Sequence, residues 1–492
     1  MKKLLHTLHS FFVMAVAVSV GVLVFSCSEG TPGSDDDGGD NPPTLSSAKS
    51  IASFSFSLSN NTSLGRTCTA IKIDDTFHVT IPLGKPLTSL VANFTASDKA
   101  VVSIGTVELT SGETAADYSA LVKLTVTAED GSTATYYVDA RNGIAEFDEE
   151  VLKFMRTYGI PGMTVSVGDA GKLVYSRGYG YACQETRERV EPDYMFRLAS
   201  VSKQFTSMCI QRLIDDGKVS LDDRPFAEGG ILAEDYPEHK EQNEKITIRN
   251  LLEHTSGWSS SMDPMFSSTT ASLSSTETVA YALRNLDFAN EPGTSFSYSN
   301  LGYCILGRII EKVTGMEYEE YLQEAVLDRV GTTDIRLGST GQAARYDREV
   351  VYYSQSGTNG YGNNMKRIDS CGGLVASTED LIRVLLSIDG RDDYPEIFPQ
   401  STLDRMFKPS DVSPHRYALG WRVNHSIFYQ GCAYHAGNLA GTSAFWVRGG
   451  DGHHTALLCN SRSYISGYDD VHYTLANTLH SYRNFPTEDL FE

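Results

Sequence analysis

The chain has 492 residues, of which 41% are hydrophobic and 21% charged, an ordinary composition for a folded protein with room for two or three domains. Its 62 acidic residues outnumber its 41 basic residues and give a formal net charge of −21 at pH 7. A surface of this charge repels phosphate backbones, and no compact run of Lys and Arg offsets it, so the composition argues against a nucleic-acid-binding protein.

The first 26 residues have the pattern of a signal peptide. Lys2 and Lys3 make a basic start, and the apolar stretch 11–25 is too short for a comfortable transmembrane helix. The stretch ends at Val24-Phe25-Ser26-Cys27, which resembles a bacterial lipoprotein signal in which Cys27 is lipidated and becomes the first mature residue. A plain signal peptide with an incidental cysteine is the alternative. Both interpretations predict export, and the first predicts a lipid anchor in a bacterial outer membrane, on its periplasmic or cell-surface side, as the only membrane contact.

Residues 27–44 form an acidic linker. This segment is rich in Gly, Pro and Asp and has no aromatic residue, so it cannot build a core and is expected to be a solvated tether. None of the 8 cysteines of the chain lies in a Cys-x-x-Cys pair or at another metal-ligand spacing. We therefore expect no metal site and no organic cofactor.

Residues 45–142 differ from the linker because Thr and Val are plentiful and helical periodicity is absent. Turn signals such as Asp130-Gly131 separate short β-rich runs. These runs lie at residues 51–58, 77–81, 121–127 and 134–138. The pattern predicts a small antiparallel β-sandwich, and it resembles the Ig-like modules at the N-termini of surface lipoproteins. It contains no set of catalytic side chains, so a spacer is the expected role; binding of a glycan or a protein stays open.

Residues 143–492 contain both helix patterns and strand patterns and predict an α+β domain. A helix and a hairpin come first, helices fill the middle, and strands followed by a helix close the chain. The expected helices are 147–157, 203–216, 302–313, 318–330 and 471–482, and the expected strands are 163–167, 173–176, 433–434, 443–447 and 455–458. We expect one antiparallel sheet assembled from both ends of the domain, with the helical middle packed as a separate lobe.

Ser200-Val-Ser-Lys203 opens an amphipathic helix that Gly217 ends. The serine hydroxyl would lie at the positive end of the helix dipole, and a lysine three residues later comes round to the same side. Such a lysine can take the serine proton when its amine is uncharged, which requires a buried site. The spacing alone is weak evidence, because Ser46-Ser-Ala-Lys49 at the edge of the linker has it too.

The wider stretch Phe196-Arg-Leu-Ala-Ser-Val-Ser-Lys-Gln-Phe-Thr-Ser207 resembles the nucleophile motif of the serine β-lactamase-like family. That family includes class C β-lactamases, DD-peptidases, D-aminopeptidases and related esterases. Leu251-Leu-Glu-His-Thr-Ser-Gly257 and Cys371-Gly-Gly-Leu-Val-Ala-Ser377 resemble its scaffold motifs, in which we interpret His254 as structural. The resemblance spans about residues 145–485 and implies a serine β-lactamase/transpeptidase-like fold and chemistry through an acyl-enzyme on Ser200.

The family pattern also asks for a Tyr-x-Asn triplet, which Tyr298-Ser-Asn300 supplies. Triplets at Tyr361 and Tyr482 also exist, but only Tyr298 follows a Pro-Gly turn and precedes a predicted helix. The resemblance implies that Tyr298 shares a proton with Lys203, so that the pair titrates as a unit, and that Asn300 orients Lys203 and a substrate amide.

The third motif is His435-Ala-Gly437, where most class C β-lactamases carry lysine in place of the histidine. It resembles the His-type motif of certain DD-peptidases and D-aminopeptidases. Because histidine is only partly charged near neutrality, it weakens the case for a carboxylate-binding β-lactamase and favours a peptidase or an esterase. The same resemblance implies an oxyanion hole made of the backbone N–H groups of Ser200 and Asn438.

The sequence therefore predicts a serine hydrolase that acts on a peptide, amide, lactam or ester carbonyl of a small molecule or a peptide, including peptides derived from the cell wall. A penicillin-binding sensor that is acylated without turnover is the alternative function. The Gly-x-Ser-x-Gly and His-Glu-x-x-His signatures of other hydrolases are both missing from the sequence. Three of the site residues could also have no catalytic role. Lys203 could be a solvated helix residue, Tyr298 a core tyrosine and His435 a structural strand residue.

Overall fold

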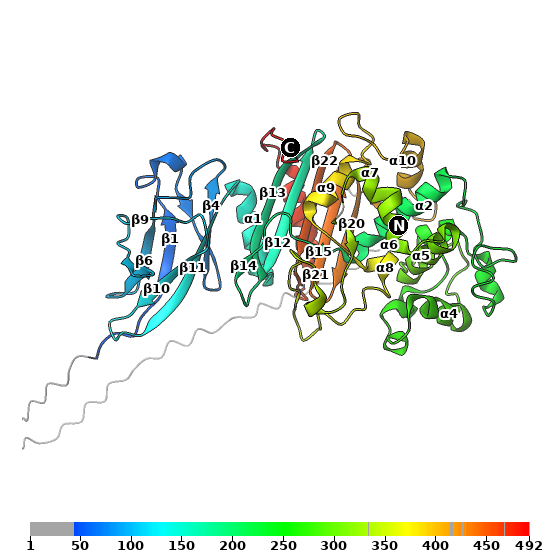
Figure 1. Ribbon diagram of the computed structural model, residues 1–492, viewed down its shortest axis with the longest axis horizontal. Coiled ribbons are helices and arrows are strands. Elements are labelled where there is room, and N and C mark those ends of the chain that lie inside the picture. The colour runs from blue at the N-terminus through cyan, green and yellow to red at the C-terminus, as the bar shows by residue number, and fades with distance from the viewer. Residues whose placement is uncertain are drawn as a thin grey trace, which may run out of the picture. The chain divides into compact units, whose positions relative to one another are not determined.

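The computed structural model describes residues 44–332, 334–413, 417–424, 428, 430–466 and 468–491 (Figure 1). The predicted signal peptide, Cys27 and nearly all of the predicted linker lie outside these residues. Residues 47–492 form one compact unit. Within the described ranges, no helix has both the length and the apolar character needed to cross a membrane.

The N-terminal part of this unit is all-β, as predicted. A three-stranded sheet packs on a six-stranded one, and the rings of Phe54 and Phe77 stack between them with centroids 5.5 Å apart. The smaller sheet has the order β2 (Cys68–Thr69), β1 (Ile51–Phe56), β6 (Asn93–Ala96). The larger has the order β3 (Ile71–Ile73), β4 (Thr76–Pro82), β11 (Thr133–Gly143), β10 (Val122–Thr127), β7 (Val101–Ile104), β8 (Val107–Glu108), and a further pair joins β5 (Leu90–Val91) to β9 (Ala115–Ala116).

One pairing departs from the expected antiparallel sandwich. Strands β4 and β11 run parallel, with Val79 beside Ala140. The two strands are far apart in the chain, so no tight hairpin forces them into opposite directions, and the long connection between them permits a parallel pair.

The second part of the unit is built around a seven-stranded antiparallel sheet. Its order is β14 (Glu188–Arg189), β13 (Lys172–Cys183), β12 (Gly162–Asp169), β22 (His453–Cys459), β21 (Thr442–Arg448), β20 (Ala433–Leu439), β19 (Arg422–Val423). Strands from the two ends of the domain meet where β12 pairs with β22, with Met163 opposite Cys459. The expectation of one sheet assembled from both ends is thus confirmed.

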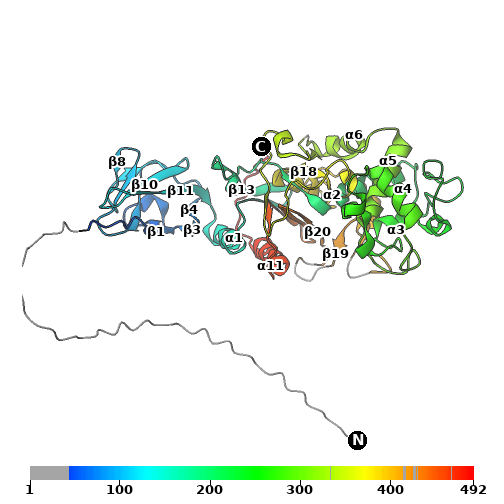
Figure 2. The same cartoon turned by 90° about the horizontal axis from the view of Figure 1, so that it is seen from below.

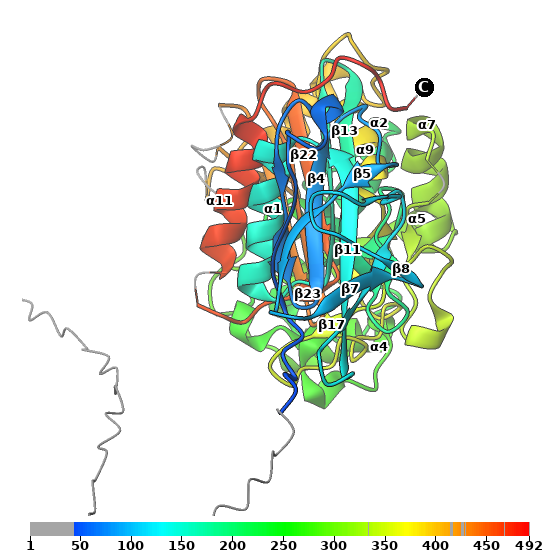
Figure 3. The same cartoon turned by 90° about the vertical axis from the view of Figure 1, so that its left-hand side faces the viewer.

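Helices cover both faces of this sheet. Helices α1 (Ala145–Tyr158) and α11 (Tyr468–Ser481) lie side by side on one face (Figures 2 and 3). Their apolar residues share a core with the strands, in which Phe147, Phe445 and Leu479 are buried. Helix α9 (Thr378–Leu386) packs on the other face, against β12 and β22.

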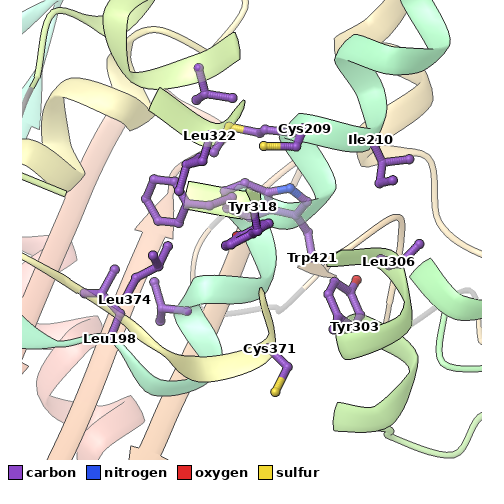
Figure 4. Close-up of a cluster of buried hydrophobic side chains, with 14 of the residues drawn as sticks. Leu198, Cys209, Ile210, Tyr303, Leu306, Tyr318, Leu322, Cys371, Leu374 and Trp421 are labelled. Atoms are coloured by element: carbon purple, nitrogen blue, oxygen red, sulfur yellow. The ribbon is translucent and has the colours of Figure 1, made fainter. Parts of the chain in front are cut away.

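The middle of the chain forms the predicted helical lobe. The helices are α2 (Ser202–Asp215), α3 (Ile248–Leu252), α4 (Ser275–Asn285), α5 (Asn300–Thr314), α6 (Tyr318–Leu322), α7 (Asp328–Val330), α8 (Asp369–Gly372) and α10 (Gln400–Phe407). A π-helical turn at Gln323–Leu327 joins α6 to α7 within the predicted helix 318–330. Figure 4 shows the core of the lobe, where α2 contributes Cys209 and Ile210 to a cluster with Leu306 and Trp421.

Short strands tie the lobe to the sheet. Strand β15 (Phe196–Arg197) pairs with β18 (Leu374–Ala376), which also pairs with β16 (Arg336–Leu337). A parallel pair joins β17 (Tyr353–Ser354) to β23 (Ser461–Arg462). Because β15 leads directly into α2, these pairings fix the point at which the buried helix of the lobe begins.

Candidate active site

Ser200 lies in a single 3-10 turn, Ala199–Val201, between β15 and helix α2. Ala199 has a φ of 47°, in the left-handed region that residues with a Cβ seldom adopt. Such strain persists only where the surrounding structure holds it, and here Leu198 and Ala199 are both buried. The turn therefore presents the half-buried Ser200 in a fixed orientation.

Lys203 reaches Ser200 from within the first turn of α2. The side chain is 0% exposed, which excludes the alternative of a solvated helix residue. Its Nζ atom lies 3.3 Å from the Oγ of Ser200, 2.8 Å from the Oδ1 of Asn300 and 2.5 Å from the carbonyl oxygen of Cys371. Two fixed carbonyl acceptors thus hold the amine beside the serine hydroxyl.

The start of helix α5 holds Asn300 in this position. Ser299 caps the helix, its Oγ accepting a hydrogen bond from the backbone N–H of Gly302. The carboxylate of Asp263 accepts further bonds from the N–H groups of Asn300, at 2.5 Å, and Leu301, at 3.3 Å. Burial raises the pKa of Asp263, and these backbone N–H groups work against that rise. Sequence reasoning missed Asp263, because an Asp-Pro pair signals only a turn.

Tyr298 lies beside Lys203 without forming the expected hydrogen bond. The Nζ of Lys203 is 5.1 Å from the centroid of the Tyr298 ring. The phenol oxygen is buried and has no hydrogen-bond partner within the described part of the chain. The prediction of a Lys203–Tyr298 proton-sharing pair is therefore not met, since three other oxygen atoms already surround the amine.

Two cavities meet at Ser200. One, of about 260 Å³, is lined by Tyr298, Arg422, His435 and Tyr473. The other, of about 370 Å³, is lined by groups that include Phe266, Asn300, Asn363 and Leu439. Ser200, Tyr298 and Asn438 line both. An extended molecule bound across Ser200 would therefore meet a cationic and phenolic wall on one side, and amides and apolar side chains on the other.

His435 is buried on strand β20, and both of its ring nitrogens are engaged. Nδ1 lies 2.7 Å from the carbonyl oxygen of Ala436, and Nε2 lies 3.0 Å from the hydroxyl of Tyr417. Burial, and then the charges of Arg422 and Lys203, hold the pKa of His435 well below its usual 6.5. Nδ1 donates to the carbonyl of Ala436, and the low pKa favours the neutral ring, in which Nε2 would be the acceptor in the contact with Tyr417. His435 lines the cavity beside Ser200, as the sequence implied, but its lowered pKa argues against the expected partial charge.

Gly437 allows β20 to approach the turn Ala199–Val201, which carries the expected nucleophile Ser200 and is called the nucleophile turn below. A Cβ at this position would collide with the carbonyl oxygen of Leu198 and would lie 3.1 Å from the backbone nitrogen of Ser200. The next residue, Asn438, lines the cavities together with Ser200, and its Oδ1 accepts a hydrogen bond from Ser443 at 3.3 Å. The structure thus brings the two residues of the expected oxyanion hole to the same cavities.

Arg422, on the edge strand β19, was missed by the sequence analysis. The side chain lines the cavity beside Ser200, and its neighbours include the phenols of Tyr417 and Tyr473. Its buried Nε has no hydrogen-bond partner among the described atoms, and no ion pair of the described side chains includes this guanidinium. A lone arginine between short connecting segments carries no sequence signal, so only the register of β19 beside β20, with Arg422 opposite Tyr434, reveals it.

The described residues hold no group of three or more His, Cys, Asp or Glu side chains that could bind a metal ion. The side chains around Ser200 supply a hydroxyl, an amine, a phenol, amides and a guanidinium.

Sequence profiles match two segments of the chain. The profile of the Beta-lactamase family matches residues 147–479, and that of the family described as SGBP, N-terminal matches residues 52–140. The latter match covers most of the all-β region, and the Ig-like resemblance stays a prediction.

Two curated relatives illustrate the similarity. Protein flp of Staphylococcus aureus (strain NCTC 8325 / PS 47) is 28% identical over 294 residues, which cover 58% of this chain and 56% of the relative. Penicillin-binding protein 4* of Bacillus subtilis (strain 168) is 25% identical over 332 residues, covering 63% of this chain and 70% of the relative. The chain thus spans little more than half the length of the first relative.

Solved structures share the fold at low identity. A penicillin-binding protein homologue from Pyrococcus abyssi has a TM-score of 0.56 at 23% identity, over 68% of this chain and 77% of that one. The D-amino acid amidase of Ochrobactrum anthropi SV3 has a TM-score of 0.55 at 21% identity, over 68% and 97%. A class C beta-lactamase has a TM-score of 0.55 at 20% identity, over 69% and 96%. At these identities the likeness concerns the fold alone.

Proposed function

Because the chain belongs to the Beta-lactamase family, we propose that it is a serine hydrolase that opens a peptide, amide, lactam or ester carbonyl through an acyl-enzyme on Ser200. The observation that carries the proposal is the contact of the fully buried amine of Lys203 with the hydroxyl of Ser200 and with two carbonyl oxygens. The substrate would be a small molecule or a peptide.

The first step would be proton transfer from Ser200 to Lys203. An uncharged amine has two N–H groups and one lone pair, and Asn300 and Cys371 accept the two N–H bonds. The lone pair then faces the Oγ of Ser200, which loses its proton as the oxygen forms a bond to the substrate carbonyl carbon. Backbone N–H groups of Ser200 and Asn438 would bind the oxyanion, a donor of this kind being worth about 10²–10³ in rate.

The second step would release the leaving group. Tyr298 lines both cavities, and its phenol is not engaged by any described residue, so it is available to bond to the leaving atom. We assign it the transfer of its own phenolic proton to that atom, which leaves a phenolate, while Lys203 keeps the proton taken from Ser200. In the last step the phenolate of Tyr298 would accept a proton from the water that attacks the acyl-enzyme, and Lys203 would return its proton to the Oγ of Ser200, which restores the hydroxyl and releases the acid.

The walls of the two cavities favour a substrate with a free carboxylate. Its lowered pKa makes His435 a poor cation near neutrality, whereas Arg422 presents a permanently charged guanidinium to the cavity. Charge-assisted bonds between guanidinium and carboxylate are among the stronger polar contacts in proteins. A peptide ending in a free carboxylate, such as one derived from the cell wall, fits this wall, with its less polar part against Phe266.

Covalent labelling tests the proposal. A fluorescent penicillin or fluorophosphonate should label the wild-type protein, and Ser200→Ala should abolish the label. Ser46→Ala is the matched control, because it alters the other Ser-x-x-Lys sequence and should leave labelling unchanged. Failure of both probes to label the wild-type protein would overturn the proposal.

The decay of the label separates hydrolysis from trapping. A hydrolase should lose the label with time as water attacks the acyl-enzyme. A label that persists would instead identify a sensor that is acylated without turnover, the second function that the sequence left open. Screening D-amino-acid amides, a chromogenic cephalosporin and short-chain esters would then identify the leaving group.

We also propose that the protein is exported and anchored through Cys27 to a bacterial outer membrane, facing the periplasm or the cell surface. The basic start, the apolar stretch 11–25 and the following cysteine support this location. Residues 45–142 would then act as a spacer between anchor and hydrolase, and the profile match over residues 52–140 leaves glycan binding by this part as a second candidate role.

A further inference from the structure

The hydroxyl of Tyr298 has no described hydrogen-bond partner, so bonds to this hydroxyl do not fix its position. The position must follow from the backbone on either side of the residue and from whatever packs against the ring. His254 provides both. It follows helix α3 in the helical lobe, and neither the proposed proton transfers nor the cavity walls involve it.

His254 accepts two hydrogen bonds from the residues on either side of Tyr298. The carbonyl oxygen of His254 accepts the backbone N–H of Ser297 at 2.8 Å. Its ring Nδ1 accepts the backbone N–H of Ser299 at 3.0 Å. The residues immediately before and after Tyr298 are thus both bound to His254, which fixes the backbone at the base of the tyrosine side chain.

The imidazole ring also packs directly against the tyrosine. The ring centroids of His254 and Tyr298 are 4.3 Å apart with an interplanar angle of 40°. Behind it, the ring of Tyr417 lies 4.6 Å away and that of Tyr303 lies 5.1 Å away. His254 is 0% exposed, so its ring has no room to move aside.

The bond to Ser299 requires a neutral histidine. Burial is the main cause that lowers the pKa of His254 well below 6.5, and the charge of Arg422 acts in the same direction. Because Nδ1 accepts a hydrogen bond, the single ring proton must lie on Nε2. An imidazolium would carry protons on both nitrogens and could not accept the N–H of Ser299.

We infer that His254 is a positioning residue that holds the phenol of Tyr298 at the leaving group, acting through its backbone carbonyl, its Nδ1 acceptor and its ring face. This inference rests on the proposed hydrolase function and extends it to a residue that touches neither substrate nor nucleophile. It replaces the interpretation of His254 as part of the scaffold alone.

Two substitutions separate the acceptor from the rest of the side chain. In His254→Asn the amide oxygen can take the place of Nδ1, whereas His254→Leu fills the site and offers no acceptor. We expect His254→Leu to lower the rate constant for acylation by about tenfold or more, within the range of general acid–base catalysis, with little change in substrate affinity. His254→Asn should recover most of that loss.

A double-mutant cycle with Tyr298→Phe identifies the route of the effect. If His254 acts through the phenol, His254→Leu should cost little further rate once the phenol has been removed. If His254 only supported the fold, His254→Leu would lower the acylation rate by the same factor with and without the phenol of residue 298. The rate losses of the Asn and Leu variants would then be ordered as their melting temperatures are. That result would overturn the inference.

Hydrogen exchange measures the clamp, which is the hold of His254 on the backbone at Ser297 and Ser299, without relying on catalysis. The backbone N–H of Ser299 should exchange faster in His254→Leu than in the wild-type protein and should be protected again in His254→Asn. If the wild-type protein proved unreactive but this pattern held, the proposed hydrolase function would fail while the clamp stood. Equal exchange in all three proteins would show that His254 does not hold this backbone.

Discussion

At the scale of single residues, the proposed preference for a free carboxylate depends on the guanidinium of Arg422. Arg422→Gln keeps hydrogen-bonding capacity but removes the charge beside Ser200. We expect it to raise the KM of a substrate with a free carboxylate by about 10–100-fold, because a hydrogen bond to a charged group is worth about 1.5–3 kcal/mol. The methyl ester of the same substrate is the control and should show almost no change, as steady-state kinetics on the pair will measure.

An equal loss for acid and ester would mean that Arg422 supports the fold of the cavity and does not read the carboxylate. A loss in kcat alone, without a change in KM, would place the guanidinium at the reacting carbonyl and would contradict its assignment to substrate binding.

The buried histidines make stability depend on pH. Burial is the main cause that lowers the pKa of both His254 and His435 well below 6.5. The unfolded chain binds protons near 6.5 while the folded chain does not, so stability is fully present above this pH and falls below it. Each histidine should reduce the free energy of unfolding by up to about 1.4 kcal/mol per pH unit in that range.

Urea unfolding at pH 7 and pH 5 measures this dependence. His435→Gln should lose one histidine's share of the slope, whatever its effect on stability at pH 7. An unchanged slope would mean that His435 binds a proton at a similar pH in the folded and unfolded protein, contrary to its lowered pKa.

The residue types of the site were predictable from the sequence, but their partners were not. Ser200, Lys203, Tyr298 and Asn300 lie together as the motif spacing implied. The fixed geometry of a helix start relates Ser200 to Lys203, whereas the hydrogen bonds of Tyr298 depend on packing that no local pattern encodes. For this reason the Lys203–Tyr298 bond was expected and is not formed, while Asp263 and Arg422 were overlooked.

At the scale of elements, the site depends on how closely strand β20 approaches the nucleophile turn. Gly437→Ala would press a Cβ against the carbonyl oxygen of Leu198, so β20 must move away from Ser200. We expect acylation to fall by at least about 10²-fold, because the oxyanion donors then lose their alignment, with a smaller loss of melting temperature. Labelling rates and thermal unfolding measure the two effects.

Gly341→Ala is the matched control, because a Cβ there meets no atom within 4 Å and its backbone is compatible with alanine. It should change neither the labelling rate nor the melting temperature. Wild-type labelling in Gly437→Ala would show that the approach of β20 is not needed for the chemistry.

Periodicity predicted the long elements well. The expected helices at 203–216 and 302–313 correspond to α2 and α5, and the expected late strands correspond to β20, β21 and β22. The short elements were not predicted, because a two-residue strand such as β19 is too short to show an alternation of apolar and polar residues. The parallel pairing of β4 with β11 was not predicted either, because packing decides the direction in which two strands distant in the chain pair.

At the scale of the whole molecule, the predicted lipid anchor is the feature to test. Cys27→Ala should abolish incorporation of a lipid label and release the protein from the membrane fraction, because a folded part without an anchor has no other expected membrane contact. Cys68→Ala is the control, since this buried cysteine lies within the β-region and should leave anchoring unchanged. Lipid incorporation into the Cys27 variant would contradict the predicted site.

The pairing of β12 with β22 at the centre of the sheet affects when the site can form during synthesis of the protein. Contacts between segments so distant in the chain close slowly, because the loop between them must first lose its freedom. Ser200 and Lys203 emerge early from the ribosome, but Asn438 arrives only with the last strands. A chain still in synthesis therefore lacks the complete site, and we expect reactivity to begin only after the last strands have been made and have paired.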